Sequence, residues 1–356
     1  MTLDRRLVTG LLMIAGLVLA LGVVQGTGSG VLEAQVTMLG IYAVLTVSLN
    51  LASGFTGLFS LGHIGFMAIG AYVSAILTLP VASKDSLLDL PDWLSGVAFD
   101  AMLGPVPVGW LAATLIAALV AAVIAALVGS VVMRLSGAFV AVATLGFLII
   151  VRVFLFNLDA YTRGSRPFSN IPHTTDLWWT WAAVVLVVYV IWRLKRSPWG
   201  RQMFAQKADG WASQSVGIPV LRPRLLAFVV SAAFCGMAGS LYAHHLTTMS
   251  PTVFYFDMTF TVMTMLVVGG LGSVSGSVLG AAIIVAVSEG LRRAEDATLL
   301  YGMSGIVLGV FFLAVIIFRP EGIMGQRELS LDGLRRLTKR GSAAARTAAS
   351  AAARRR

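Results

Sequence analysis

The sequence predicts an all-α polytopic membrane protein with about ten transmembrane helices. Of its 356 residues, 58% are hydrophobic and only 12% are charged, about half the charged share of a soluble domain. Its charge-free stretches are long enough to cross a bilayer, which takes about 20 apolar residues per helix. So much apolar surface excludes a disordered chain, and a single cysteine, Cys235, excludes an internal disulfide framework.

The first five spans follow in order along the chain. Residues 7–32 hold the first. Residues 34–83 carry no charge over 50 positions, which is too long for one helix at about 1.5 Å per residue. Two spans are therefore expected there, with a break at residues 54–57. Residues 101–133 and 136–156 predict the fourth and fifth spans.

The remaining spans are shorter or interrupted. Residues 177–192 and 225–246 predict the sixth and seventh. Residues 258–288 are uncharged, but the glycine-rich stretch 269–276 divides them into two short helices, the eighth and ninth. Residues 297–318 complete the set as the tenth.

The basic residues fix the orientation, because they concentrate on the cytoplasmic side of a membrane protein. With a cytoplasmic N-terminus, ten spans place 20 of the 26 basic residues inside and both termini in the cytoplasm. Residues 1–33 then form the first helix and a short outer loop, which we expect to be retained and not cleaved as a signal peptide. Residues 34–323 form a membrane core with a cytoplasmic segment at 193–224, and residues 324–356 form a basic tail.

Three classes of membrane protein fit this organisation: a passive channel, an ion-coupled carrier and the membrane subunit of an ATP-driven transporter. Ion-coupled carriers commonly hold carboxylates near mid-membrane, and the interiors of these spans contain essentially none. No Gly-Lys pair occurs, so the chain has no P-loop. If ATP drives transport, another subunit must bind it.

The cytoplasmic segment 193–224 has its own helical signals. Ser197-Pro198 predicts a turn, residues 201–216 have helical composition, and Gly217 with Pro219 ends the helix. Such a helix is either an amphipathic connector at the interface or a coupling helix that fits a groove on a nucleotide-binding subunit.

A set of motifs resembles the branched-chain amino-acid permease family of ABC importers. The matches run from about residue 42 to residue 323 in the expected order, which is far more specific than one glycine cluster. They are residues 53–72 (SGFTGLFSLGHIGFMAIGAY), 217–220 (GIPV), 226–228 (LAF), 238–243 (AGSLYA), 250–251 (SP), 268–281 (VGGLGSVSGSVLGA) and 318–323 (FRPEGI).

The resemblance implies a bacterial inner-membrane permease core built of two inverted repeats with glycine-broken helices. It also implies a homologous second permease subunit in a heterodimer, two cytoplasmic ATPase subunits that hold ATP and Mg, and an external solute-binding protein. The chain itself would be no enzyme and would need no cofactor or nucleic acid. The solute would be a branched-chain or other apolar amino acid. Urea or short amides and aromatic or aliphatic carboxylates are alternatives, and an ATP-independent facilitator is the alternative from another class.

The family's coupling helix maps onto about residues 204–217. The resemblance places Phe204 at its start, Asp209 at its acidic position and Gly217 at its glycine. Trp211 and Gln214 stand where smaller or acidic residues are expected, which leaves the matching ATPase open.

The two glycine-rich breaks fall in corresponding places in the two halves, and such paired breaks point to a transport site. Freed backbone groups can bind a polar solute only where they line a cavity. We therefore predict that four side chains lie near the translocation path, although His63 could equally be a packed histidine. The side chains are Ser60, His63, Ser273 and Ser275, and the glycines of the breaks are Gly54, Gly57, Gly62, Gly269, Gly270, Gly272 and Gly276.

Arg152 lies within the fifth span, about 24 Å from its start at about 1.5 Å per residue. It either extends its charge to the outer interface or acts as an outer gate or solute contact. His244-His245 is expected near the outer end of the seventh span as an interfacial pair, because adjacent residues on a helix face different directions. No spacing typical of a metal site occurs.

Overall fold

The computed structural model describes residues 15–88, 106–298, 302–319 and 321–325, with positions 91, 96, 99, 101, 102 and 328. The chain divides into two compact units, residues 30–326 and residues 1–29 with 327–356. In the second of these units the described part is a helix, Ala15–Gly26. Residues 7–14 of the first expected span, and nearly all of the basic tail, lie outside the described residues.

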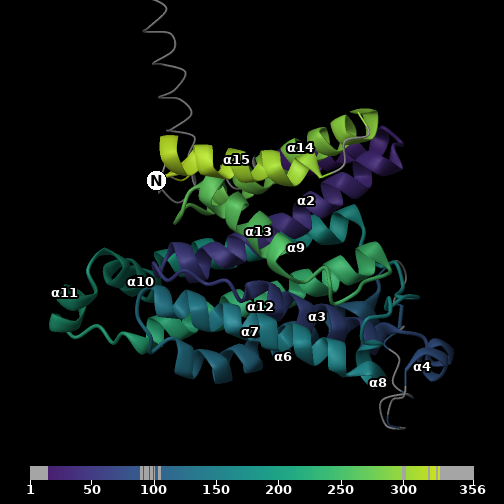
Figure 1. Cartoon of the computed structure of the whole chain (residues 1–356), viewed down its shortest axis with the longest axis horizontal. Coiled ribbons are helices and arrows are strands. Elements are labelled where there is room, and N and C mark those ends of the chain that lie inside the picture. The colour runs from purple at the N-terminus through teal and green to yellow at the C-terminus, as the bar shows by residue number, and fades with distance from the viewer. Residues whose placement is uncertain are drawn as a thin grey trace, which may run out of the picture. The chain divides into compact units, whose positions relative to one another are not determined.

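The unit of residues 30–326 is helical, and a β-bridge joins Phe168 to Met249 (Figure 1). Its elements are α2 (Gly30–Leu49), the π-helical turn η1 (Asn50–Gly54), α3 (His63–Thr78), α4 (Val81–Leu87), α6 (Val108–Val132), α7 (Ala138–Asn157), α8 (Asp159–Thr162), α9 (Leu177–Arg196), α10 (Pro198–Ala208), α11 (Gly210–Ser215), α12 (Leu221–Leu246), α13 (Phe256–Gly269), α14 (Val274–Thr298) and α15 (Met303–Phe318).

Six of the described helices are long and apolar enough to cross a membrane. These are Gly30–Gly54, Val108–Val132, Ala138–Asn157, Leu177–Arg196, Leu221–Leu246 and Val274–Thr298. Shorter apolar helices are Ala15–Gly26, His63–Thr78, Phe256–Gly269 and Gly305–Phe318. The long and short helices together follow the expected spans in order. The all-α class is therefore confirmed for the described residues, while ten crossings and the inverted repeats stay predictions.

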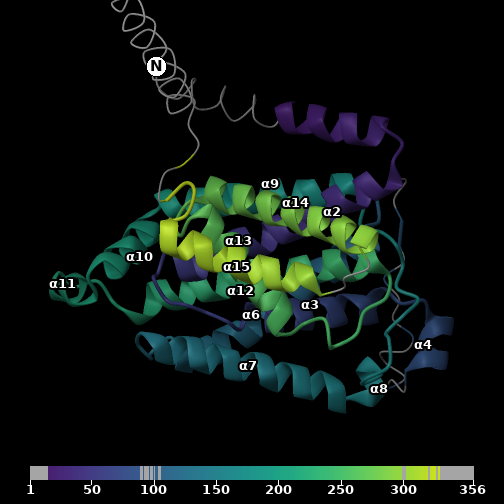
Figure 2. The same cartoon turned by 45° about the horizontal axis from the view of Figure 1, so that its top comes forward.

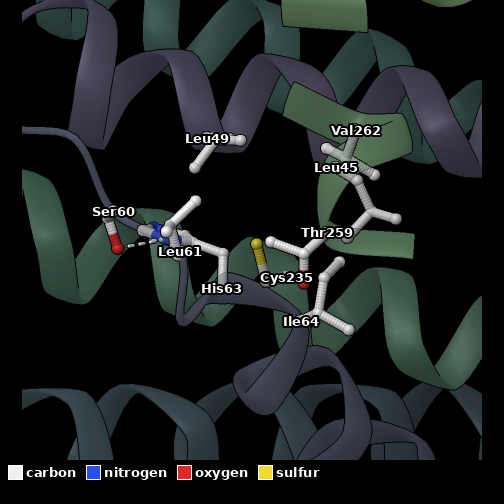
Figure 3. A pocket seen from close by; sticks show the side chains of 9 residues that line it. All are labelled: Leu45, Leu49, Ser60, Leu61, His63, Ile64, Cys235, Thr259 and Val262. Atoms are coloured by element: carbon white, nitrogen blue, oxygen red, sulfur yellow. Dashed lines mark hydrogen bonds between the residues drawn. The ribbon is translucent and has the colours of Figure 1, made fainter. Parts of the chain in front are cut away.

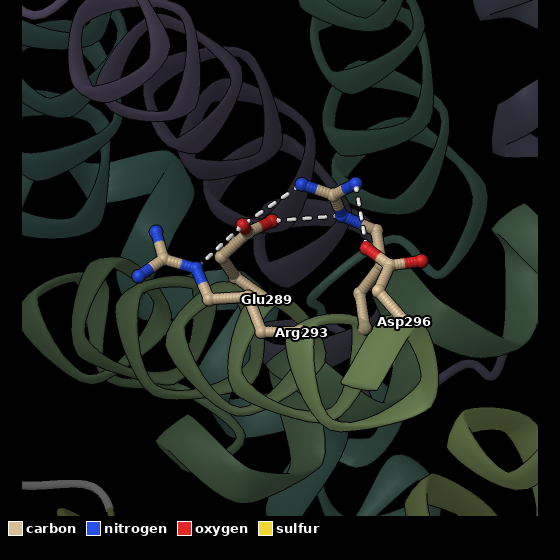
Figure 4. A network of polar contacts seen from close by, with 4 residues as sticks. Glu289, Arg293 and Asp296 are labelled. Carbon is tan, nitrogen blue, oxygen red and sulfur yellow. Dashed lines mark hydrogen bonds and ion pairs between the residues drawn. The ribbon is translucent and has the colours of Figure 1, made fainter. Parts of the chain in front are cut away.

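One boundary differs clearly from the sequence prediction. The ninth span was expected to end at residue 288 and the tenth to begin at residue 297, but α14 continues to Thr298. Glu289 accepts hydrogen bonds from Arg292 at 2.9 Å and from Arg293 at 3.1 Å, and Arg292 lies 3.8 Å from Asp296 (Figure 4). These partners are three and four residues apart, the spacing that supports a helix, so the charged stretch extends α14.

Helix α12 forms the centre of the core, where it packs against α2, α3 and α6. Small residues allow its backbone to approach α3 closely. A Cβ on Gly70 would lie 2.1 Å from the carbonyl oxygen of Gly236, and a Cβ on Gly239 would lie 2.0 Å from that of Met67. Neither position has room for a larger side chain unless the backbone moves.

A polar seam joins α12 to α3 and α6. The Ser240 hydroxyl lies 2.6 Å from that of Ser74 and 2.7 Å from that of Thr114. His244 is fully buried, with Nε2 at 2.7 Å from the Thr78 hydroxyl and Nδ1 at 2.8 Å from the Ser240 carbonyl oxygen. His244 therefore faces the helix bundle, while its expected place at the membrane interface stays a prediction. A histidine whose two ring nitrogens both have partners can be buried inside a helix bundle.

The two ends of this unit differ. Helices α10 and α11 project from one end, and α4 and α8 lie at the other (Figure 2). The π-helical turn that ends α2 and the start of α14 lie at the α10 end, since both contact residues of the segment from α9 to α10. We call this the α10 end.

Replacing Gly70 with alanine should destabilise the protein by about 1–3 kcal/mol, the usual cost of overpacking. The new Cβ would overlap the Gly236 carbonyl oxygen, which is backbone and cannot rotate away. Thermal unfolding of the purified protein in detergent measures the effect. Gly146→Ala in α7 is the matched control, because its Cβ meets nothing within 4 Å, and the same unfolding temperature for both variants would contradict the prediction.

Candidate functional site

The two breaks predicted from the glycine pattern lie against each other. Helix α2 ends in a π-helical turn, in which the Phe55 amide donates to the Asn50 carbonyl oxygen at 3.1 Å. Helix α13 ends at Gly269, and α14 begins at Val274. A Cβ on Gly54 would lie 2.8 Å from the Gly272 nitrogen. The backbones of the two breaks therefore approach each other closely at this point.

The side chain of Asn50 connects the breaks with three hydrogen bonds. Its Oδ1 accepts from the Gly272 amide at 2.8 Å. Its Nδ2 donates to the Ser273 carbonyl oxygen and to the Ser277 hydroxyl, both at 2.8 Å. Asn50 is fully buried. Sequence reasoning missed this residue, although it is the only asparagine in the uncharged stretch 34–83.

Two lysines reach the same place from the cytoplasmic segment. Lys207 in α10 donates from Nζ to the Gly54 carbonyl oxygen at 2.7 Å. Lys195 in the last turn of α9 donates to the Gly272 carbonyl oxygen at 2.6 Å. Sequence reasoning counted these lysines only as charges that report orientation, and no local pattern indicated that they contact the breaks.

The structure brings Ser60 and His63 together beside a small cavity (Figure 3). The Ser60 hydroxyl lies 2.9 Å from His63 Nδ1, and both residues are buried. The His63 ring stands edge-on to the rings of Phe66 and Phe228. The cavity measures about 10 Å³, which is room for about one water molecule. It is lined by Leu45, Leu49, Ser60, Leu61, His63, Ile64, Cys235, Thr259 and Val262.

Ser273 and Ser275 also lie together, at the start of α14. Ser273 is fully buried, and its hydroxyl accepts from the Gly276 amide at 3.0 Å. The Ser275 hydroxyl lies 3.3 Å from that of Ser273 and is half-buried. The first helical N–H groups lack partners within the helix, and Ser273 supplies one. In this arrangement the serines complete the second break, and contact with a solute stays a prediction.

The expected single helix over residues 201–216 is wrong, because the segment forms α10 and α11 with a break at Asp209. The Asp209 carboxylate accepts from the amides of Trp211 and Ala212 at 2.9 and 3.0 Å and so caps α11. Gly217 adopts φ +82°, and the Ile218 amide donates back to the Ser213 carbonyl oxygen at 3.0 Å. This is the Schellman ending that favours glycine.

The three predicted coupling residues therefore have different surroundings. Phe204 faces the core, where its ring lies 4.9 Å from that of Phe55. Asp209 and Gly217 shape the two ends of α11. The exposed apolar side chains of this region are instead Trp211, 84% exposed, and Val216, 75% exposed.

Arg152 is half-buried and stacks on aromatic rings. Its guanidinium carbon lies 3.6 Å from the ring centroid of Tyr255 and 5.4 Å from that of Phe156. Such cation–π contacts stabilise a charge without a carboxylate. Among the residues that the structure describes, no cluster of three or more His, Cys, Asp or Glu could hold a metal ion.

Comparison with known proteins gives consistent matches. The family described as branched-chain amino acid transport system / permease component matches residues 31–316. The permease protein LivM of the high-affinity branched-chain amino acid transport system of Escherichia coli (strain K12) is 32% identical over 349 residues, covering 88% of this chain and 74% of that protein. LivH of the same system and strain is 25% identical over 313 residues, covering 83% and 94%.

A more distant relative is named for a different solute. The fructose import permease protein FrcC of Rhizobium meliloti is 30% identical over 133 residues, covering 35% of this chain and 37% of that protein. No solved structure matches the chain significantly. The family match spans most of the chain, and the described helices are apolar enough to cross a membrane repeatedly. The chain is a multi-pass membrane protein and belongs to the permease component family of branched-chain amino acid transport systems.

Proposed function

We propose that the chain is the permease subunit of an ATP-driven importer of branched-chain amino acids. The observation that carries this proposal is the match to LivM over most of both chains. The fructose permease resembles only about a third of this chain, and nothing in the site favours urea, amides or aromatic and aliphatic carboxylates. The shared family therefore supports an amino-acid solute best.

The similarity to two permease proteins of one transport system supports a heterodimer. The chain is more similar to LivM than to LivH of the same strain, so we propose that it takes the LivM position beside a LivH-like second chain. Two ATPase subunits, which bind ATP and Mg, and an external solute-binding protein would complete the assembly. The α10 end and both termini would face the cytoplasm of a bacterium, with the chain in the inner membrane.

The α10 end supplies the contact with the ATPases. Trp211 and Val216 expose large apolar side chains there, and in this proposal they pack into a groove on the ATPase. Phe204 joins α10 to the first break, while Asp209 and Gly217 fix where α11 begins and ends. This chain would carry out no covalent chemistry, and ATP hydrolysis would act on it through α11.

The solute would pass when the two breaks separate. The cavity beside Ser60 and His63 holds about one water molecule and is far too small for an amino acid. Ser60, His63, Ser273 and Ser275 would meet the solute only in an opened conformation. Arg152, stacked on Tyr255, would act as a gate or solute contact on the outer side.

Reconstitution of the complete assembly in liposomes tests this function directly. We expect ATP-dependent uptake of radiolabelled leucine, isoleucine or valine that requires the ATPases and the binding protein. Liposomes that contain only the permease pair are the control and should show no flux. Solute flux without any ATPase would instead support the facilitator. ATP-dependent uptake of urea or a carboxylate in preference to leucine would contradict the proposal that the solute is a branched-chain amino acid.

Asn50→Asp should lower uptake by about tenfold or more. The carboxylate would lose both Nδ2 donors and would face the Ser273 carbonyl oxygen, and hydrogen bonds of this kind are worth about 0.5–1.5 kcal/mol each. Leucine uptake by the reconstituted assembly measures the effect. Asn157→Asp, the same change at an exposed asparagine of α7, is the control, and equal uptake by both variants would refute a role for Asn50 at the breaks.

Asp209→Asn should keep uptake close to normal, whereas Asp209→Ala should reduce it. Asparagine caps a helix as well as aspartate does, while alanine loses about 0.5–2 kcal/mol of helix stability. The comparison separates the cap from a charge contact with the ATPase. If Asp209→Asn fails as badly as Asp209→Ala while both assemble, the carboxylate charge itself is required and the capping explanation is wrong.

A further inference from the structure

Each helix break accepts a hydrogen bond from one lysine of the segment that leads to α11. Lys195 lies in the last turn of α9 and bonds Gly272. Lys207 lies near the end of α10 and bonds Gly54. The acceptors are the carbonyl oxygens of the two glycines that touch each other across the breaks. Both breaks are therefore tied to the same short segment.

Lys207 packs against both breaks along its whole length. A Cβ on Gly57, in the first break, would lie 3.0 Å from the Lys207 Cγ. A Cβ on Gly272, in the second break, would lie 3.6 Å from its Nζ. The methylene stem thus covers the first break while the ammonium group reaches toward the second. Through this one side chain α10 contacts both breaks.

An aromatic pair reinforces the junction. The rings of Phe55 and Phe204 lie 4.9 Å apart and join the first break to α10. The Lys195 Nζ lies 5.4 Å from the centroid of the Phe55 ring and 5.6 Å from that of Phe204, within the range of a cation–π interaction. α9, α10 and both breaks therefore meet at one cluster.

Two opposing electrostatic effects act on this cluster. Burial, and next the positive charge of Lys195, lower the pKa of Lys207, so the two like charges disfavour the arrangement. The carbonyl oxygens of Gly54 and Gly272 favour it, since each accepts a charge-assisted hydrogen bond. A junction balanced in this way suits a switch between two packed arrangements.

We propose that Lys195 and Lys207 are positioning residues that transmit a displacement of α10 and α11 to both helix breaks. This inference rests on the proposed function, because the displacement would come from ATPases docked on α11. When α10 moves, Lys207 would draw the carbonyl group of Gly54 with it while Lys195 ties that of Gly272 to α9, so the two breaks would separate. The lysines touch no solute in this step and act only through the backbone of the breaks.

The transport test uses Lys195→Met and Lys207→Met in the complete reconstituted assembly. Methionine keeps an unbranched side chain but removes the charge and the donor. We expect leucine uptake to fall by about tenfold or more, the change for one lost charge-assisted hydrogen bond, while the ATPases still copurify and still hydrolyse ATP. Arg134→Met, which removes one exposed positive charge after α6 at the same end, is the control and should transport normally.

Two results would overturn the proposal. Wild-type uptake by both methionine variants would show that the lysines transmit nothing. A parallel loss of uptake, hydrolysis and copurified ATPase would show that they only stabilise the fold. Either result is informative only after the wild-type assembly has shown ATP-dependent uptake, and failure at that earlier step would count against the proposed function instead.

Hydrogen exchange of the purified permease tests the linkage without any transport. Lys207→Met should raise the exchange of backbone amides in residues 50–62, because the first break loses its tie to α10. Lys195→Met should raise it in residues 270–277, because the second break loses its tie to α9. In the lysine variants, the amides of α12, and those of α3 after its first turn, should keep their protection. In the control Arg134→Met, all amides should keep their protection. Unchanged exchange at the breaks, or a uniform increase along the chain, would refute the linkage whatever the solute proves to be.

Discussion

The amide side chain of Asn50 is the contact on which the rest of the site depends. Lipid cannot satisfy the backbone groups that a broken helix exposes, so a break at membrane depth must find partners within the protein. Asn50 accepts from one backbone group of the second break and donates to another. A π-helical turn begins at Asn50, and turns of this kind are frequent at functional sites. The first break thus stabilises the second.

Close approach is the reason that glycine occupies both breaks. A side chain on Gly54 would overlap both Asn50 and the Gly272 nitrogen, so the three hydrogen bonds of Asn50 would be lost. Gly272 has φ +101°, a conformation that residues with a Cβ rarely adopt. The glycine pattern therefore indicates a place where two backbones must touch. Close approach explains these glycines better than backbone flexibility does.

The sequence was informative about local features and less so about partners. Charge-free stretches and glycine clusters predicted the order of the apolar helices and the position of both breaks, because these follow from neighbouring residues. The partners of Asn50 lie more than 220 positions away, and a single sequence carries no signal for such pairing. The split between α10 and α11 could be predicted only by recognising Asp209 as the cap of α11. An aspartate at this position is equally compatible with a surface charge. The burial of His244 was not predicted, because one of its two hydrogen-bond partners, Thr78, comes from another helix. The other, the Ser240 carbonyl oxygen, lies one turn earlier in the same helix.

The contacts of α3 differ in kind at its two ends, and this difference indicates which end can rearrange more easily. Toward the end away from α10, Ser74 and Thr78 bond α12 through side chains that are wholly buried, in a region where glycines bring the backbones together. Close packing of this kind resists deformation. At the α10 end, the chain before α3 is held by the Asn50 amide, the lysines and a 3.3 Å hydrogen bond from the Ser60 amide to Ser53. Polar ties of this type can be exchanged for others at little net cost in free energy. The bundle therefore packs α3 tightly at one end, and we expect conformational change at the other end, where α10, α11 and both breaks meet.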